Sequence, residues 1–196
     1  MIGSNGSAVI GVDPGYASGA AVRWDGGAVD EWVVWWRTKR KGVPMLLVET
    51  SLSDDPRRCL PAATGQRVAL RSFRCIIPGA ELLAVEGLFA VGGRGAASGR
   101  ELLPLSHSAG VAEGVLAPPG VATARPLARV WRHSQLGLPG GTKAAIAEKV
   151  AIERSRLVMR WRFGFPVELP KIPIGALCEA AWIARYGATV HQWEGV

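Results

Sequence analysis

Three carboxylates stand in apolar surroundings along this sequence, and each is a side chain that could hold a metal ion or move a proton. Asp13 ends the apolar run AVIGVD and is followed at once by Pro14 and Gly15. Glu86 lies within ELLAVEGLFAV, and Glu179 lies among Ala, Leu, Ile and Trp residues near the C-terminus. A buried carboxylate is unstable as an anion unless a cation or a shared proton compensates its charge. These residues are therefore the first candidates for a site of chemistry.

The chemistry that suits such a group is that of a hard metal ion. Oxygen ligands, with no cysteine or well-placed histidine among them, favour Mg²⁺ or Mn²⁺. Two such ions about 4 Å apart can activate water and stabilise the leaving oxygen in phosphodiester hydrolysis. Each carboxylate taken alone could equally be solvated or salt-bridged at the end of its element. Cys59, Cys75 and Cys178 have no C-x-x-C spacing, so the sequence indicates neither a disulfide framework nor a zinc site.

Positive charge is concentrated in one part of the chain. The formal net charge is +7, and residues 121–162 alone hold nine basic side chains and two acidic ones. A localised basic segment favours a polyanionic partner, with nucleic acid the first choice, although it could also be a solvated basic face.

The composition predicts a single globular domain over residues 1–196. Hydrophobic residues make up 48% and charged residues 20% of the chain, which is enough to form a sizeable core. No apolar run approaches the roughly 18 residues of a membrane span, and the N-terminus has no signal-peptide pattern. We therefore expect a cytoplasmic protein with no membrane partner.

Apolar runs and turn residues predict the order of the elements. Strands are expected at 8–12, 20–24 and 29–36, joined in part by the turn Asp25-Gly26-Gly27 into an antiparallel meander. An exposed connection is then expected at 37–61, a helix at 64–73, a strand within 81–91, a loop at 92–99, a helix at 100–116 and a strand with its exit at 121–131. Two helices follow, one at 143–157 with Thr142 as its N-cap and one at 174–186 ended by Gly187. This order predicts an α/β fold, one mixed sheet with helices on its faces.

Four tryptophans lie in the first hairpin, at positions 24, 32, 35 and 36. With a period of two residues they cannot all face one core. We expect most of them to pack, although some could stack on bases or cover the edge of the sheet.

Four segments resemble the RuvC-type Holliday junction resolvases of the RNase H-like superfamily. IGVDPGYASGAAV resembles the first-strand motif of that family, and LLAVEGLF resembles its second motif, a strand ending in Glu with an aromatic residue three positions later. CEAAWIARYG is similar to the third motif as found in phage-type members, and VWRHSQLGLPGGTKAAIAEKVA fits the basic strand, loop and helix before it. The matches occur in the family's order and span residues 8–187. A member of this family would have an RNase H-like fold with a five-stranded mixed sheet, three antiparallel strands followed by parallel ones.

The resemblance implies a role for each matching residue. Asp13, Glu86 and Glu179 would be catalytic metal ligands for Mg²⁺, with Mn²⁺ as a substitute and two ions in each site. Phe89 would stack on unpaired bases at the junction centre, unless it is an ordinary core residue. Arg132 and Lys143 would contact the DNA near the scissile phosphate, with Lys143 counted among the catalytic residues; the alternative for Lys143 is a solvated lysine in the first turn of a helix. From the basic segment, Arg129 and Lys149 are further candidates for DNA binding.

The implied activity is that of a structure-selective endodeoxyribonuclease. It would cut branched DNA, a four-way junction, and leave a 5′-phosphate and a 3′-hydroxyl. The helix at 100–116, with small residues at Ala109, Gly110 and Gly114, resembles the helix through which the family forms a homodimer. A two-fold dimer would place two sites on one junction and allow paired nicks. The alternative is a helix that packs only on its own sheet.

One departure from the family pattern leaves alternatives open. The family commonly has a further acid three positions before the residue matched by Glu179, and this chain has Ala176 there. The site could use three carboxylates, with water, Glu168 or His133 completing it; Ala176 could be an inactivating substitution; or the protein could bind junctions without cutting them. A broader nuclease of the same fold is a further alternative. An actin-like ATPase is disfavoured, because the chain is short for two lobes and has no second phosphate loop.

Overall fold

A computed structural model describes residues 8–51, 57–76, 80–87, 99–117 and 120–194. The strands are β1 (Ala8–Asp13), β2 (Ser18–Asp25), β3 (Ala28–Arg40), β4 (Val43–Thr50), β5 (Arg57–Pro61), β6 (Ala80–Val85), β7 (Ala122–Ala124) and β8 (Arg160–Trp161). The helices are α1 (Gly65–Ile76), α2 (Gly99–Leu116), α3 (Ala128–Leu136), α4 (Ala144–Val158) and α5 (Lys171–Glu194).

The strands form one mixed sheet in the order β5-β4-β3-β2-β1-β6-β7, and β8 pairs with β3. The strands from β1 to β5 pair antiparallel with their chain neighbours. β6 and β7 extend the sheet with parallel pairing beside β1. The expected α/β class with a mixed sheet is therefore confirmed. The expected number of five strands was wrong, since the described residues form eight.

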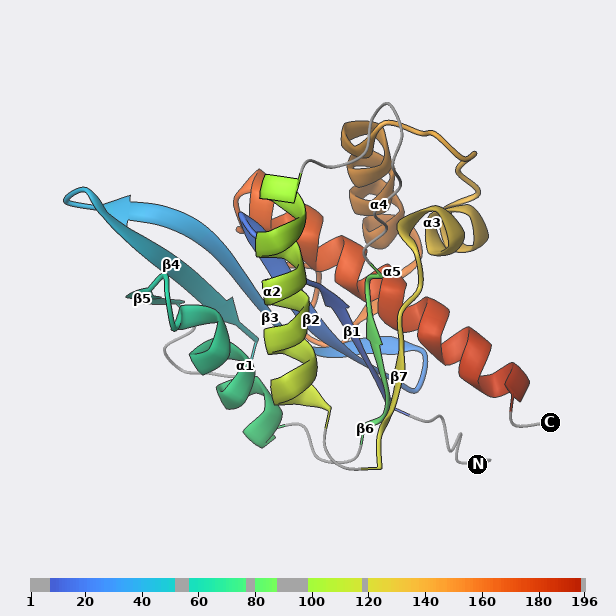
Figure 1. Cartoon of the computed structure of the whole chain (residues 1–196). Coiled ribbons are helices and arrows are strands. Elements are labelled where there is room, and N and C mark those ends of the chain that lie inside the picture. Colours follow the sequence, from blue (N-terminus) through green and yellow to red (C-terminus); the bar gives the residue numbers. More distant parts are fainter. Residues whose placement is uncertain (1–7, 52–56, 77–79, 88–98, 118–119, 195–196) are drawn as a thin grey trace.

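Helices cover both faces of the sheet (Figure 1). α5 lies across β1 and β2 on one face, with α3 and α4 packed against it, and α1 and α2 cover the other face. Successive side chains of β1 enter different cores: Val9 packs on the α5 side, whereas Ile10 and Val12 pack on the side of α1 and α2. Figure 1 thus shows a three-layer arrangement in which α5 runs along the strand that carries Asp13.

The tryptophans of the first hairpin divide between the two cores, as expected. Trp24 and Trp32 are buried on the α5 side, and Trp35 is buried on the opposite side. Trp36 is partly buried against the α5 side. Three of the four tryptophans are therefore buried in the protein interior, and Trp36 is partly exposed.

The close contact between α5 and β1 requires a residue without a side chain at position 11. A Cβ atom on Gly11 would clash with the carbonyl oxygen of Ala180 and would lie 2.6 Å from Cβ of Ala184. Further along α5, a Cβ on Gly187 would lie 3.0 Å from Cβ of Ala84. The expected end of this helix at Gly187 was wrong, because this glycine serves close packing on the sheet and α5 continues to Glu194.

The expected exposed connection at 37–61 was also wrong. β3 continues to Arg40 and turns at Lys41 and Gly42, which both have positive φ angles, 50° and 80°. β4 and β5 then extend the sheet, and Leu46 and Val48 of β4 are buried. A two-residue turn of this geometry suits the twist of paired strands, so the basic stretch forms a hairpin.

The segment before α4 departs from the sequence-based expectation at two points. The expected strand at 121–131 is limited to β7, because Pro126 has no N–H for a ladder and α3 begins at Ala128. Thr142 is not the N-cap of α4: its hydroxyl donates to the carbonyl of Pro139 (2.7 Å), and the cap position is occupied by Lys143. The expected helices at 64–73, 100–116 and 143–157 are confirmed as α1, α2 and α4.

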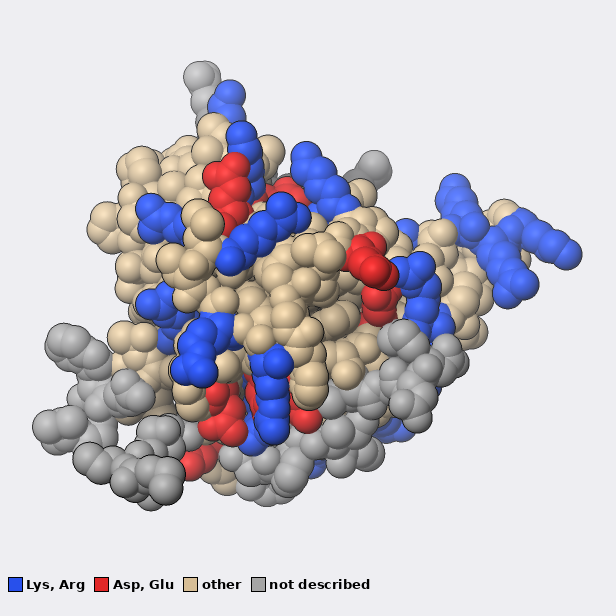
Figure 2. Space-filling view, turned by 180° about the vertical axis from the view of Figure 1, so that it is seen from behind, with Lys and Arg blue, Asp and Glu red and all other residues tan. Residues whose placement is uncertain are grey.

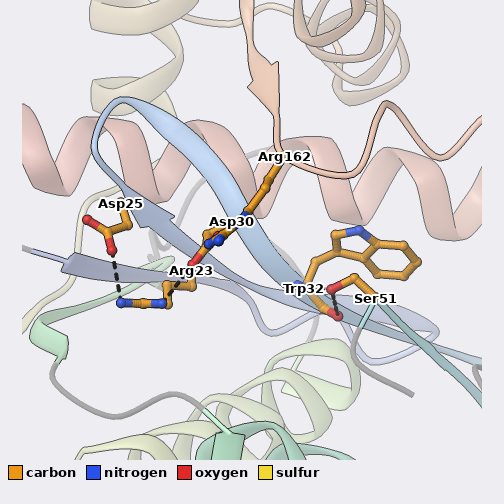
Figure 3. Close-up of polar contacts among 6 residues, drawn as sticks. All are labelled: Arg23, Asp25, Asp30, Trp32, Ser51 and Arg162. Carbon is orange, nitrogen blue, oxygen red and sulfur yellow. Dashed lines mark hydrogen bonds and ion pairs between the residues drawn. The ribbon is translucent and has the colours of Figure 1, made fainter. Parts of the chain in front are cut away.

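A cluster of ion pairs connects the beginning of β3 to β2 and to the segment after β8 (Figure 3). Asp30 is buried, and its carboxylate accepts hydrogen bonds from Arg23 (2.7 Å) and from Arg162 after β8. Arg23 also pairs with Asp25 at 2.9 Å. These ion pairs connect the first hairpin to the segment that follows α4. Further along β3, the backbone N–H of Trp32 donates to the hydroxyl oxygen of Ser51 at 2.9 Å.

Among the described helices, none combines the length and the apolar character that crossing a membrane would need.

Replacing Gly11 with Ala tests how closely α5 lies on β1. The added methyl group must displace α5, so we expect the free energy of unfolding to fall by about 1–3 kcal/mol. Gly110 on α2 has open space around its Cα, and Gly110→Ala is the matched control, expected to be neutral or stabilising by up to about 1 kcal/mol. Urea unfolding of both variants measures the difference; equal stability of the two would contradict the packing described.

Candidate active site

The sheet register brings Asp13 and Glu86 to the same place. On β1, residues 9, 11 and 13 alternate toward α5, and on β6 Leu82 and Ala84 lie in the α5-side core, so Glu86, two residues on, continues that side. The two strands are parallel and adjacent, with Val12 opposite Val85, and the N–H of Glu86 donates to the carbonyl of Val12 at 3.0 Å. Both carboxylates therefore stand at the carboxyl ends of neighbouring strands.

Glu179 joins them from α5. The helix contacts β1 at Gly11 through Ala180, the residue after Glu179, so the close packing of helix on strand sets the position of this carboxylate. The charges of Glu86 and Glu179 both act on Asp13. The structure thus brings together the three carboxylates that the sequence singled out.

α3 supplies the positive charge of this cluster. Nη2 of Arg132 lies 2.7 Å from Oε1 of Glu179 and 4.0 Å from Oε1 of Glu86. The preceding residue, Trp131, is fully buried, and its indole N–H donates to Oε1 of Glu86 at 3.1 Å. Arg132 was expected to contact DNA; in this structure it pairs with a carboxylate.

Burial raises the pKa of all three carboxyl groups, and repulsion from neighbouring acids adds to this effect for Asp13 and Glu179. For Asp13, burial is the largest cause, followed by the charges of Glu86 and Glu179, and the pKa lies well above its usual range. The backbone N–H of Gly15, 3.1 Å from Oδ1 of Asp13, opposes this increase. Burial also raises the pKa of Glu86, against the effects of Arg132 and Trp131, and it raises the pKa of Glu179 to about 7 despite Arg132. Arg132 thus faces three carboxylates, of which Asp13 is buried and Glu86 and Glu179 are partly buried.

The chemistry of this donor set fits a hard divalent cation. All three candidate ligands are carboxylates, and Arg132 is the cation that lowers the pKa of each against the effect of burial. Within the part of the chain that the structure describes, no three His, Cys, Asp or Glu side chains are grouped closely enough to hold one ion as they stand. Arg132 is the counter-charge of Glu179 in this arrangement, so a cation would have to compete with it.

The other residues expected in the site lie outside the carboxylate cluster. Lys143 is exposed at the N-cap of α4, and Lys149 is exposed on α4, where it lies 3.9 Å from Glu153. Arg129 is exposed on α3. These three cations belong to the outer surface of α3 and α4. Phe89 lies outside the described residues.

The position where a fourth acid was expected is part of the core. Ala176 is buried in the α5-side hydrophobic cluster. His133 and Glu168, the possible substitutes, are both exposed, and Nδ1 of His133 lies 3.2 Å from the carbonyl of Leu138. Neither contributes to the shifted pKa values of the cluster.

A different acid, Glu148 of α4, lies close to this position. A Cβ on Gly175 would be 2.8 Å from Cγ of Glu148, and the charge of Glu148 raises the pKa of Glu179. The sequence analysis missed both Glu148 and Trp131. The signal for Glu148 was its place as one of two acids in a basic segment, but only the packing of α4 on α5 shows which way it faces.

A cavity of about 380 Å³ opens beside Glu86, between α2 and the ends of β6 and β7. Its lining includes Ser106, Glu113 and Arg125, and Arg125 is paired with Glu113 at 2.6 Å. Of the three carboxylates, Glu86 lines this cavity and Asp13 and Glu179 do not.

No family model matches this sequence, and comparison with curated proteins finds no match.

The stability of the metal-free protein should fall as the pH rises from 5.5 to 8. In the folded state, carboxyl groups with a raised pKa keep their protons up to about pH 7, whereas in the unfolded state they lose them near pH 4.5. The free energy of unfolding is therefore greatest at the acidic end of this range and decreases as the pH rises through about 7. With chelator present we expect a decrease in Tm of roughly 5 °C. Glu179→Gln should reduce this decrease, whereas Glu168→Gln, at an exposed position, should leave it unchanged. A Tm that increases over this range would contradict the description of the cluster.

Proposed function

We propose that this protein is a metal-dependent, structure-selective endodeoxyribonuclease that cuts four-way DNA junctions, with an RNase H-like fold of the RuvC type. The observation that carries the proposal is the convergence of Asp13, Glu86 and Glu179 at one end of the sheet, where burial raises the pKa of each and Arg132 is the cation that acts on all three. They are the same three residues to which the family resemblance assigns the metal ions.

The topology around the cluster supports the same proposal. β3, β2 and β1 are antiparallel, and β6 and β7 add parallel strands beside β1. An RNase H-like domain is expected to have such a sheet. The remaining strands, β4, β5 and β8, are additions at its edges.

In this proposal the carboxylates hold the metal ions, and the residues around them position a carboxylate or bind the DNA. Bound Mg²⁺, or Mn²⁺ in its place, would supply an activated water and stabilise the leaving oxygen. Asp13, Glu86 and Glu179 hold the ions, and Trp131 fixes the orientation of Glu86 through its indole N–H. Once Glu179 ligates an ion, the guanidinium of Arg132 is free to donate to a phosphate oxygen. Lys143, Arg129 and Lys149 attract the DNA backbone to the surface of α3 and α4.

A homodimer would allow both strands of a junction to be cut. Gly110 and Gly114 of α2 are exposed and have open space around them, although α2 also packs on α1 and β6 of its own chain. Two copies joined along α2 would present two sites related by a two-fold axis.

A second candidate function is junction binding without cleavage. Two observations favour it. Arg132 already pairs with Glu179, where a metal ion would bind, and Ala176, at the position of the expected fourth acid, is packed in the hydrophobic core. In that case the carboxylate cluster would be a buried charge network.

Cleavage of a labelled four-way junction separates the two candidates. Wild-type protein with Mg²⁺ should nick the junction near the crossover, and removal of Mg²⁺ should abolish nicking. Asp13→Asn and Glu86→Gln should each slow nicking by more than roughly 100-fold, because each removes a metal ligand, while junction binding in Ca²⁺ stays near the wild-type level.

Three outcomes would change the proposal. Nicking that survives Asp13→Asn would rule out the mechanism. Tight binding with no nicking in Mg²⁺ or Mn²⁺ would establish the binding protein instead. Equal cleavage of flaps, hybrids and junctions would establish a broader nuclease.

A further inference from the structure

β3 and β4 continue beyond the rest of the sheet as a two-stranded arm, residues 37–44. β2 begins at Ser18 opposite Trp36, and β5 ends at Pro61 opposite Met45. Pairing between β3 and β4 continues past both points to Arg40 opposite Val43. Figure 1 shows this hairpin projecting away from the body of the protein. At about 3.3 Å per residue, the four residues beyond Trp36 give the arm a length of roughly 13 Å.

The arm is strongly and uniformly basic. It carries Arg37, Lys39, Arg40 and Lys41, and no Asp or Glu occurs between residues 37 and 48. All four cations are exposed. Figure 2, which views the opposite side of the molecule, shows Lys and Arg side chains gathered at the end of this projection. Among the described residues, no carboxylate pairs with Lys39, Arg40 or Lys41.

Packing does not explain the arm. The first buried residue of β4 is Leu46, beyond the arm, and Val43 at the tip is 57% exposed. A two-stranded ribbon without a third strand is marginally stable in water, and like charges at its tip reduce its stability further. A polyanion would supply the counter-charge that no described carboxylate provides to Lys39, Arg40 and Lys41.

The root of the arm is fixed to the loop that follows Asp13. The guanidinium of Arg37 lies 3.5 Å from the centre of the Tyr16 ring, and its Nε donates to the carbonyl of Tyr16 at 3.1 Å. The backbone N–H of Arg37 donates to the carbonyl of Ala17 at 2.8 Å. A nucleic acid held by the arm is therefore held at a defined position relative to the carboxylate cluster.

We propose that the arm binds the phosphate backbone of duplex DNA, on a branch of the junction outside the point of cleavage. That the polyanion is DNA rests on the proposed function, whereas the inference that a polyanion binds rests on the exposed cations of the arm. A two-stranded β-ribbon has the width to lie in or along a groove of duplex DNA. Lysine and arginine side chains at its tip contact phosphates and read no sequence, so the contact adds affinity and orientation without base specificity.

The test compares wild-type protein with K39A/R40A/K41A and with the charge-preserving K39R/R40K/K41R. Binding of a fluorescein-labelled four-way junction and of a 30-bp duplex is measured by anisotropy in Ca²⁺ over a series of salt concentrations. For the alanine variant we expect a Kd about 10- to 50-fold higher at 0.1 M salt, and a slope of log Kd against log salt smaller by about 2 to 3, since each lost phosphate contact removes about 0.9. The charge-preserving variant should bind as the wild type does. The rate of nicking at saturating DNA should be unchanged in both.

The outcomes separate this inference from the proposed function. Unchanged affinity and salt dependence in the alanine variant would overturn the role of the arm, and so would an effect confined to single-stranded DNA or RNA. Equal loss of affinity in both variants would also overturn it, because the charge would not be the cause. A wild type that never nicks, but whose affinity for duplex DNA depends on the arm, would leave the arm in place and overturn the nuclease. Thermal unfolding checks that all three proteins are equally folded.

Discussion

The burial of three carboxylates around one arginine is the constraint on which the rest of this structure depends. Asp13, Glu86 and Glu179 each lose hydration in the fold. The charges of Glu86 and Glu179 make the ionisation of Asp13 more costly, and the charge of Glu86 does the same for Glu179. Arg132 reduces this cost without removing it, and the pKa of Glu179 stays near 7. A core of this size has no need of such a group for stability, since apolar residues of similar volume would pack there at lower cost. We propose that additional positive charge, a divalent cation, binds at this cluster.

Ordinary features of an α/β sheet are enough to build that cluster. Alternation along two parallel strands directs Asp13 and Glu86 toward the same helix. Gly11 lets α5 approach the strand, which brings Glu179 to the same end. α3 then adds Arg132 and the indole of Trp131 from outside the helix layer. The site is therefore set by backbone packing, and Arg37 at the root of the basic arm is hydrogen-bonded to the loop that follows Asp13.

The sequence identified the three carboxylates because each interrupts an apolar run, which is a local signal. It also predicted the meander, α1, α2 and α4, whose periodicity is clear. It missed α3 because the apolar pattern of 121–131 suits a strand and Pro126 alone does not show where the strand stops. It missed β4 and β5 because a polar, Ser-, Asp- and Pro-rich composition resembled a loop, although Lys41-Gly42 carried a hairpin signal. The partners of the carboxylates, Trp131 and Glu148, depend on contacts between distant elements, and no local pattern reveals those.

We propose that a divalent cation binds this cluster in competition with Arg132. A crystal of the wild-type protein soaked in Mn²⁺, with the ion located by its anomalous scattering, tests this directly. We expect at least one Mn²⁺ about 2.0–2.2 Å from carboxylate oxygens of Asp13 and of Glu86 or Glu179, with Arg132 displaced from Glu179. An intact Arg132–Glu179 ion pair at millimolar Mn²⁺, with no anomalous peak among the three carboxylates, would contradict it.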